Sequence, residues 1–226
     1  GLNLAKNDRS GVMLLMEGYM DVISLHQAGI GNAVASLGTA FTPEQARLLK
    51  KYAQRAVLCY DADQAGQKAT LRAGQILTDA EIKTRVLTIT DGKDPDEFIQ
   101  SKGPEMFRIL IDDAKPLFMY RMDHLKQNYD LKDTEQVIEF TEAAAAVLAE
   151  INKPTERELY LKQAAATAGV SEESLLTQVN VLLRKKDAMH RRRAEREDRQ
   201  SFERRTGGRR DLKKMGICNA ESLLLN

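Results

Sequence analysis

Cysteine and histidine, the usual ligands of zinc, are scarce in this chain of 226 residues. It has two cysteines, Cys59 and Cys218, which form no CxxC pair, and three histidines. Zinc sites in proteins need several such ligands at short spacing, so we expect no zinc site within this sequence. Two isolated thiols are typical of proteins in a reducing compartment, and we therefore expect a cytoplasmic protein.

Long apolar runs and an aromatic surface for stacking bases are missing as well. No run approaches the roughly 20 apolar residues of a transmembrane helix, so we expect no membrane partner. The six tyrosines and six phenylalanines are scattered along the chain. They form no aromatic-plus-basic platform of the kind that binds single-stranded nucleic acid.

Charge of one sign is concentrated in a single segment. Residues 184–214 hold 14 Lys/Arg against 6 Asp/Glu, and the remainder of the chain holds 20 against 27. A basic segment on an acidic body is either a solvated linker or a nucleic-acid contact. The glutamates interspersed in RRRAERE favour a linker that leads to a further domain.

Short apolar runs alternate with helix-length segments in the first part of the chain. The runs VMLLM, NAVASLG, AVLCY and TRVLTI are continuous rather than alternating in polarity. This pattern predicts an α/β fold whose parallel sheet is covered by helices on both faces. Between two of the runs, TPEQARLLKKYA predicts a helix with Thr42 as N-cap and Pro43 at the first helical position.

The second part of the chain has no strand pattern and predicts an all-α helical bundle. One helical face is formed by Val137, Phe140, Thr141, Ala144 and Leu148. Gly169 predicts a helix end, and Ser171 predicts the cap of the next helix. The expected domains are an α/β domain at 1–103, a bundle at 104–183, a basic linker at 184–214 and the start of another domain at 215–226.

Acidic side chains follow two of the predicted strands. Glu17 follows the first, and Asp61 and Asp63 follow the third. The carboxyl ends of parallel strands share one edge of the sheet, where such proteins bind ligands. Three carboxylates brought together there would raise one another's pKa and weaken the fold unless a cation joined them. An all-oxygen ligand set suits Mg²⁺ or Mn²⁺.

Each acidic motif also has a simpler interpretation. A DxD sequence alone is often a turn or a helix cap. The later DGKDPDE loop, with Asp94 and Asp96, could equally begin a helix, with Pro95 in its first turn. The order strand–Glu, then strand–DxD, within one α/β unit is what favours a metal site.

Three motifs together resemble the Toprim domain of bacterial DNA primases. They are EGYMD, YDADQAG and GKDPDE, and the segments VASLGTAFTPEQARLLKKY, ERELYLKQAA and GVSEESLL also resemble that family. The resemblance covers residues 1–183. It implies a nucleotidyltransferase that synthesises RNA primers on a single-stranded DNA template from ribonucleoside triphosphates, at the replication fork in the nucleoid.

The resemblance also implies roles for individual residues. Glu17, Asp61 and Asp63 would be the catalytic carboxylates that bind Mg²⁺ or Mn²⁺. Further acidic positions near the metals would be Asp21, Asp94 and Asp96. Lys93 would contact a phosphate, unless it is an ordinary loop lysine.

Primases contain further parts that this sequence does not show. A zinc-binding domain would precede this region, so zinc is expected only there, and NAESLLLN resembles the start of a domain that binds the replicative helicase. We therefore expect an internal fragment that is poorly active alone. The alternatives are another Toprim phosphodiesterase, of the nuclease or topoisomerase type, and a non-catalytic interaction module.

Overall fold

The computed structural model describes residues 1–36, 40–89, 94–189 and 191–192. The chain divides into two compact units, Gly1–Val147 and Leu148–Asn226. In the part of the chain that is described, no helix combines the length and apolar character needed to cross a bilayer.

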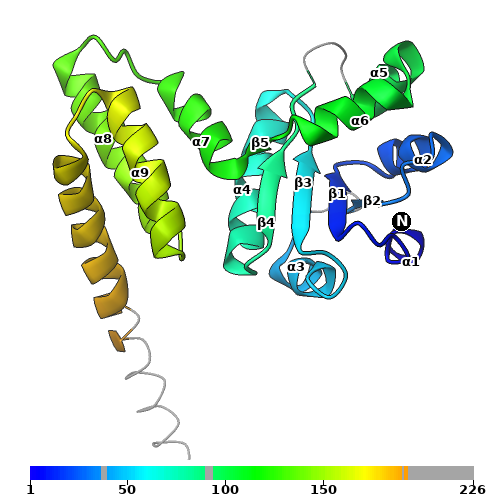
Figure 1. Cartoon of the computed structure of the whole chain (residues 1–226), viewed down its shortest axis with the longest axis horizontal. Helices are drawn as coiled ribbons and strands as arrows, with labels where there is room; N and C mark the ends of the chain where they lie inside the picture. The colour runs from blue at the N-terminus through cyan, green and yellow to red at the C-terminus, as the bar shows by residue number, and fades with distance from the viewer. Residues whose placement is uncertain (37–39, 90–93, 190, 193–226) are drawn as a thin grey trace, which may run out of the picture. The chain divides into compact units, whose positions relative to one another are not determined.

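A five-stranded sheet forms the centre of the first unit (Figure 1). Its strands are β1 (Val12–Met16), β2 (Ala33–Ala35), β3 (Arg55–Cys59), β4 (Lys83–Val86) and β5 (Lys115–Pro116), in the order β2-β1-β3-β4-β5. The first four strands are parallel, and β5 pairs with β4 in the antiparallel direction. The four apolar runs of the sequence are thus confirmed as strands of a parallel sheet.

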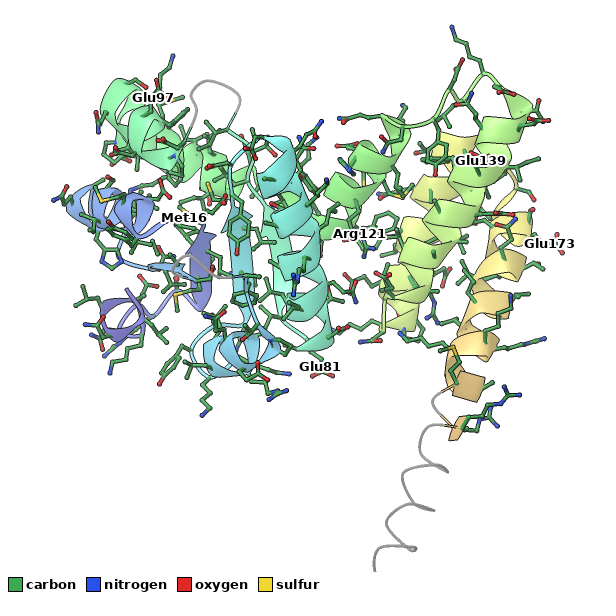
Figure 2. The ribbon with its side chains drawn as sticks, turned by 180° about the vertical axis from the view of Figure 1, so that it is seen from behind. Met16, Glu81, Glu97, Arg121, Glu139 and Glu173 are labelled. Carbon is green, nitrogen blue, oxygen red and sulfur yellow. The ribbon has the colours of Figure 1, made fainter. Side chains whose placement is uncertain are left out.

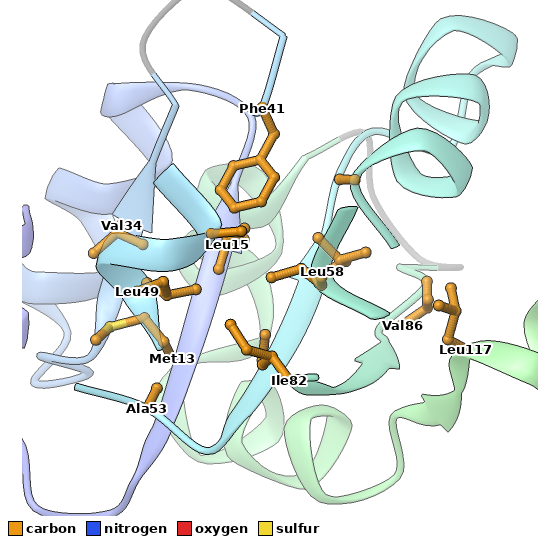
Figure 3. Close-up of a cluster of buried hydrophobic side chains, with 14 of the residues drawn as sticks. Met13, Leu15, Val34, Phe41, Leu49, Ala53, Leu58, Ile82, Val86 and Leu117 are labelled. Atoms are coloured by element: carbon orange, nitrogen blue, oxygen red, sulfur yellow. The ribbon is translucent and has the colours of Figure 1, made fainter. Parts of the chain in front are cut away.

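Both faces of the sheet are buried, which explains why its strands are apolar without alternation. In β1, Met13 and Leu15 point into one core cluster, and Leu14 and Met16 belong to the other. The first cluster, drawn in Figure 3, also contains Leu58 of β3 and side chains from the helices on its face. The sheet therefore forms the middle layer of a three-layer α/β/α unit.

Helices cover both faces. In chain order, buried side chains of α1 (Leu2–Ala5), α2 (Tyr19–Gln27), α3 (Pro43–Leu49), α4 (Gln64–Asp79), α5 (Pro95–Lys102), α6 (Pro104–Asp112) and α7 (Leu117–Lys126) join the two core clusters. The next helix, α8 (Thr134–Ala149), contributes no residue to either cluster. The predicted cap of α3 is confirmed, because the Thr42 side chain accepts a hydrogen bond from the backbone N–H of Gln45. Pro43 then occupies the first helical position, where its missing N–H costs nothing.

The sheet extends beyond the expected α/β domain. No strand was expected after residue 103, yet β5 adds Lys115 and Pro116 to the edge of the sheet. Two residues, one of them proline, are too short for a sequence pattern, and proline is tolerated on an edge strand. The division of the chain into units also falls later, between Val147 and Leu148. The expected domain limits remain predictions.

The second unit is helical where it is described. It contains α9 (Pro154–Ala168) and a helix over residues 172–189. Gly169 ends α9 in the left-handed conformation at φ 70°, and the Ser171 hydroxyl accepts a hydrogen bond from the N–H of Ser174, so both predicted boundary signals are confirmed. The side chains of 184–189 are exposed, whereas residues 193–226, which include most of the predicted basic linker, lie outside the described residues.

The predicted apolar face of α8 is confirmed. Phe140, Thr141, Ala144 and Leu148 are buried, and Val137 is partly buried. Within the first unit, the ring of Phe140 contacts Tyr129 edge to face, with ring centres 5.9 Å apart.

Candidate active site

Glu17 and Asp61 meet at the carboxyl edge of the sheet. Met16 of β1 is directly opposite Cys59 of β3, so the residues that follow each strand leave the sheet side by side. The Glu17 carboxylate accepts a hydrogen bond from the backbone N–H of Asp61, with Oε2 3.4 Å from the nitrogen. The two strand ends therefore bring these acidic residues together, as the sequence predicted.

Asp63 begins α4. It is the N-cap residue, and its Oδ1 accepts a hydrogen bond from the N–H of Gly66 at 2.7 Å. Aspartate is among the best N-cap residues because its carboxylate satisfies a backbone donor and is favoured by the positive end of the helix dipole. The cap interpretation of the DxD motif is thus correct for Asp63, and it holds the carboxylate beside the strand end that carries Asp61.

Gly66 allows α4 to approach the backbone of Asp61. A Cβ atom placed on Gly66 would lie 2.2 Å from the carbonyl oxygen of Asp61 and 2.9 Å from its carbonyl carbon. Any side chain would have to displace backbone atoms rather than a mobile side chain. The glycine in YDADQAG therefore determines the position of Asp61 relative to the helix.

The pKa of Asp61 is shifted by burial and by the other carboxylates near it. Its pKa is raised, first by burial and then by the negative charges of Glu17, Asp63 and Asp94. Four carboxylates from three different loops thus act on one another, which agrees with the repulsion expected from the sequence. A bound cation would relieve this repulsion.

Asp21 belongs to the same electrostatic group. It lies in the first turn of α2, and its Oδ2 accepts a hydrogen bond from the N–H of Gly18 at 3.2 Å. Burial raises the pKa of Asp21 to about 6, and the hydrogen bond from Gly18 opposes this rise. The charges of Asp94, Asp61 and Asp96 raise the pKa further.

The stability of the metal-free protein should therefore depend on pH through Asp21. With a pKa of about 6 in the folded state and an ordinary value of 3.8, the folded state binds more protons between these pH values, so stability is lost as pH rises from about 4 to 6. Because the side chain is partly solvated, we expect a loss of only about 1 kcal/mol.

Asp21→Asn should flatten this slope and raise stability at pH 7, while the amide oxygen can still accept the hydrogen bond from Gly18. Urea denaturation in EDTA at pH 4, 5, 6 and 7 measures the effect, and Asp112→Asn on the exposed side of α6 is the matched control. An unchanged slope in Asp21→Asn would contradict this assignment.

Asp94 and Asp96 differ in what they contact. Asp94 is the N-cap of α5, where its Oδ1 accepts the N–H of Glu97 at 2.8 Å, and its charge raises the pKa of both Asp21 and Asp61. The helix-cap interpretation of the DGKDPDE loop is therefore correct for Asp94. The predicted phosphate contact of this loop, Lys93, lies outside the described residues.

Asp96 connects α5 to α2. Its Oδ1 accepts hydrogen bonds from the Ser24 hydroxyl at 2.5 Å and from the Gln100 side chain at 2.9 Å. These two hydrogen bonds, that from Ser24 first, lower the pKa of Asp96. No sequence motif marks Ser24, although its position three residues after Asp21 places it on the same side of the helix.

Ser24→Ala should loosen α5 from α2 without changing the carboxylates themselves. We expect the melting temperature to fall by about 3 °C, because one interhelical hydrogen bond is lost. Ser101→Ala removes a hydroxyl that bonds only to Phe98 within α5 and serves as the control. Combined with Asp96→Asn, the effect of Ser24→Ala should be smaller than alone, and full additivity in thermal melts would refute the link.

The donor set fits a hard divalent cation. Glu17, Asp61 and Asp63 offer only oxygen atoms, which suit Mg²⁺ or Mn²⁺ better than zinc. In the described ranges, no three Asp, Glu, His or Cys side chains are close enough together to hold a metal ion. Mutual repulsion keeps carboxylates apart in the absence of a counter-charge.

Comparison with known proteins identifies the fold and the motifs. A family model described as Toprim-like matches residues 14–99, and one described as the DnaB-helicase binding domain of primase matches residues 118–173. The second match lies within the expected helical bundle, whereas the start of a helicase-binding domain was expected near residue 215. The Toprim-like match contains all six candidate acidic residues of the site, Glu17, Asp21, Asp61, Asp63, Asp94 and Asp96.

Characterised relatives and solved structures agree with these matches. A DNA primase of Clostridium acetobutylicum is 43% identical over 186 residues, which are 82% of this chain and 31% of the relative. A primase domain of Pseudomonas aeruginosa superposes with a TM-score of 0.68 at 32% identity, covering 79% of this chain and 58% of that one. The E. coli primase catalytic core superposes with a TM-score of 0.66 at 30% identity. The match covers 74% of this chain and 55% of that one.

The chain thus spans about a third of the length of its primase relatives. Its parallel sheet, its acidic strand ends and the similarity of most of its length to primase catalytic cores lead to one conclusion. The chain belongs to the bacterial DNA primase family, of which it contains the Toprim region and helical segments that follow it.

Proposed function

We propose that this chain provides the metal-binding part of an enzyme that synthesises RNA primers on single-stranded DNA from ribonucleoside triphosphates. The observation that carries the proposal is the hydrogen bond between Glu17 and the backbone of Asp61, which joins the acidic ends of β1 and β3. The same acidic motifs occupy the Toprim-like region that the chain shares with DNA primases.

Glu17, Asp61 and Asp63 would hold Mg²⁺ or Mn²⁺ and are the proposed catalytic carboxylates. When bound, such ions orient the reacting phosphate and hydroxyl groups and lower the charge that develops between them. Asp21 and Asp94 interact electrostatically with Asp61, since the charge of Asp94 raises the pKa of both Asp21 and Asp61. We propose these two residues as additional metal ligands. Asp96, held by Ser24, would position the α5 end of the site rather than bind the ion.

The partners are proposed from the relatives. A solved structure at 29% identity, a DnaG primase catalytic domain bound to single-stranded DNA, supports the template. The DnaB-helicase binding match at residues 118–173 supports contact with a replicative helicase. Ribonucleoside triphosphates follow from the proposed reaction, and Lys93 remains the predicted phosphate contact. Because a primase works at the replication fork, we propose that the protein acts in the cytoplasm, at the nucleoid.

Metal binding by the chain itself tests the proposal. We expect isothermal titration to show Mn²⁺ binding that Asp61→Ala and Asp63→Ala each weaken by about tenfold or more, because each removes a charged ligand. Glu105→Ala, at an exposed acidic residue of α6 paired with Arg108, should leave the affinity unchanged. Unaltered affinity in both site variants would favour a structural role for the acidic group, and metal-dependent DNA cleavage by the chain would favour a nuclease.

A further inference from the structure

A cavity of about 470 Å³ opens beside the acidic group. Small-molecule sites in proteins have volumes of roughly 300–1,000 Å³, so the cavity can hold a ligand. It is lined by Asp61 and Ala62 at the edge of the sheet, by residues 86–88 at the end of β4, and by side chains of α4 and α7. All of these belong to the first unit.

Direct contacts hold the two helical walls together. Gly74 of α4 leaves room for Leu117 of α7, since a Cβ atom at Gly74 would lie 2.6 Å from a Leu117 methyl group. Arg121, which Figure 2 shows on α7, donates a hydrogen bond to the Gln75 side chain at 3.3 Å. The cavity is therefore bounded by a defined helix–helix contact.

The lining favours a planar, neutral group with hydrogen-bonding edges. Tyr60, Tyr120 and His124 contribute aromatic side chains to the lining. Gln67 and Gln127 add side-chain amides, which can donate and accept hydrogen bonds. Aromatic faces bind nucleic-acid bases by stacking, with little dependence on which base is present.

The charges of the lining disfavour a phosphate inside the cavity. Asp61, Asp113 and Asp123 contribute three carboxylates. Lys115, the one Lys or Arg among these lining residues, forms an ion pair with Asp123 at 2.7 Å. A phosphate group would thus meet net negative charge in the cavity, but it could reach a cation held by Asp61.

We propose that the cavity binds the base of a nucleotide whose phosphates extend to the metal site at Asp61. This inference rests on the proposed function for the position of the phosphates. It assigns Tyr120 and His124 of α7, outside the acidic motifs, to recognition of the nucleotide.

The test compares two probes, ATP and inorganic tripolyphosphate, each titrated with Mg²⁺ into the 226-residue chain. Both carry phosphates for the metal, but only ATP has a base for the cavity. We expect ATP to bind about tenfold more tightly than tripolyphosphate. Thr88→Trp and Gln127→Trp add bulk to the lining at exposed positions that follow β4 and α7, and each should remove this difference while leaving tripolyphosphate binding unchanged.

Gln163→Trp, on the exposed surface of α9, is the control and should bind both probes as the unsubstituted chain does. If tripolyphosphate binds as tightly as ATP, or if both tryptophan variants retain the preference for ATP, the cavity is not a base site although the metal site stands. If neither probe binds with Mg²⁺, the proposed function fails together with this inference.

Discussion

Asp63→Asn should abolish primer synthesis while leaving the fold intact. Asparagine is as good an N-cap as aspartate, so its side-chain oxygen can still accept the hydrogen bond from Gly66. The substitution removes one negative charge from the group that raises the pKa of Asp61, which relieves repulsion in the metal-free protein. It also removes a charged metal ligand, and we expect primer synthesis to fall at least about a hundredfold.

Asp63→Ala separates the two roles of this residue. Alanine cannot cap α4, so this variant should lose about 1 kcal/mol of stability in addition to activity. The measurements are thermal denaturation of each variant chain and primer synthesis by a full-length primase that carries the same change. A large loss of metal-free stability in Asp63→Asn, or retained synthesis in that variant, would contradict the assignment.

Gly66→Ala should have the largest effect on stability. The added Cβ atom would lie 2.2 Å from the carbonyl oxygen of Asp61, and backbone atoms cannot move away as a flexible side chain could. We expect a loss of about 2–3 kcal/mol, in the upper part of the range typical of overpacked sites. Because the clash pushes α4 away from Asp61, the affinity for Mn²⁺ should fall as well.

Gly31→Ala is the matched control for this substitution. Among the described residues, no heavy atom beyond its chain neighbours would lie within 4 Å of a Cβ at Gly31. We expect denaturant midpoints of Gly31→Ala and the unsubstituted chain to agree closely. If Gly66→Ala were as stable as Gly31→Ala and bound Mn²⁺ normally, the close approach of α4 to Asp61 would be irrelevant to the site.

The sequence predicts the layers of the fold because buried parallel strands and capped helices leave local patterns. The apolar runs of β1 and β3, Thr42 at the start of α3 and Gly169 at the end of α9 are all such patterns. Strand β5 leaves none, since Lys115 and Pro116 become a strand only because β4 offers them a free edge. Local pattern therefore predicts the elements but not the completed sheet.

The sequence likewise predicts the acidic residues of the site but not the tertiary contacts around them. Glu17 and Asp61 each follow a strand, which predicts that they lie close together. The register of β1 with β3 places the two strand ends side by side and so produces the contact. The bond between Ser24 and Asp96 joins residues 72 positions apart, and the cavity beside Asp61 depends on how α7 packs on α4. Such contacts arise only from tertiary packing. For Asp63, the sequence offered a cap or a ligand as alternatives, whereas the geometry permits one residue to be both.

Anomalous scattering from crystals of the chain soaked in Mn²⁺ tests the central claim most directly. We expect at least one manganese peak at ligand distance, roughly 2.1–2.2 Å, from oxygen atoms of Glu17, Asp61 and Asp63. A peak bound elsewhere on the chain, with these three carboxylates still apart and uncoordinated, would show that the acidic edge of the sheet is not a metal centre.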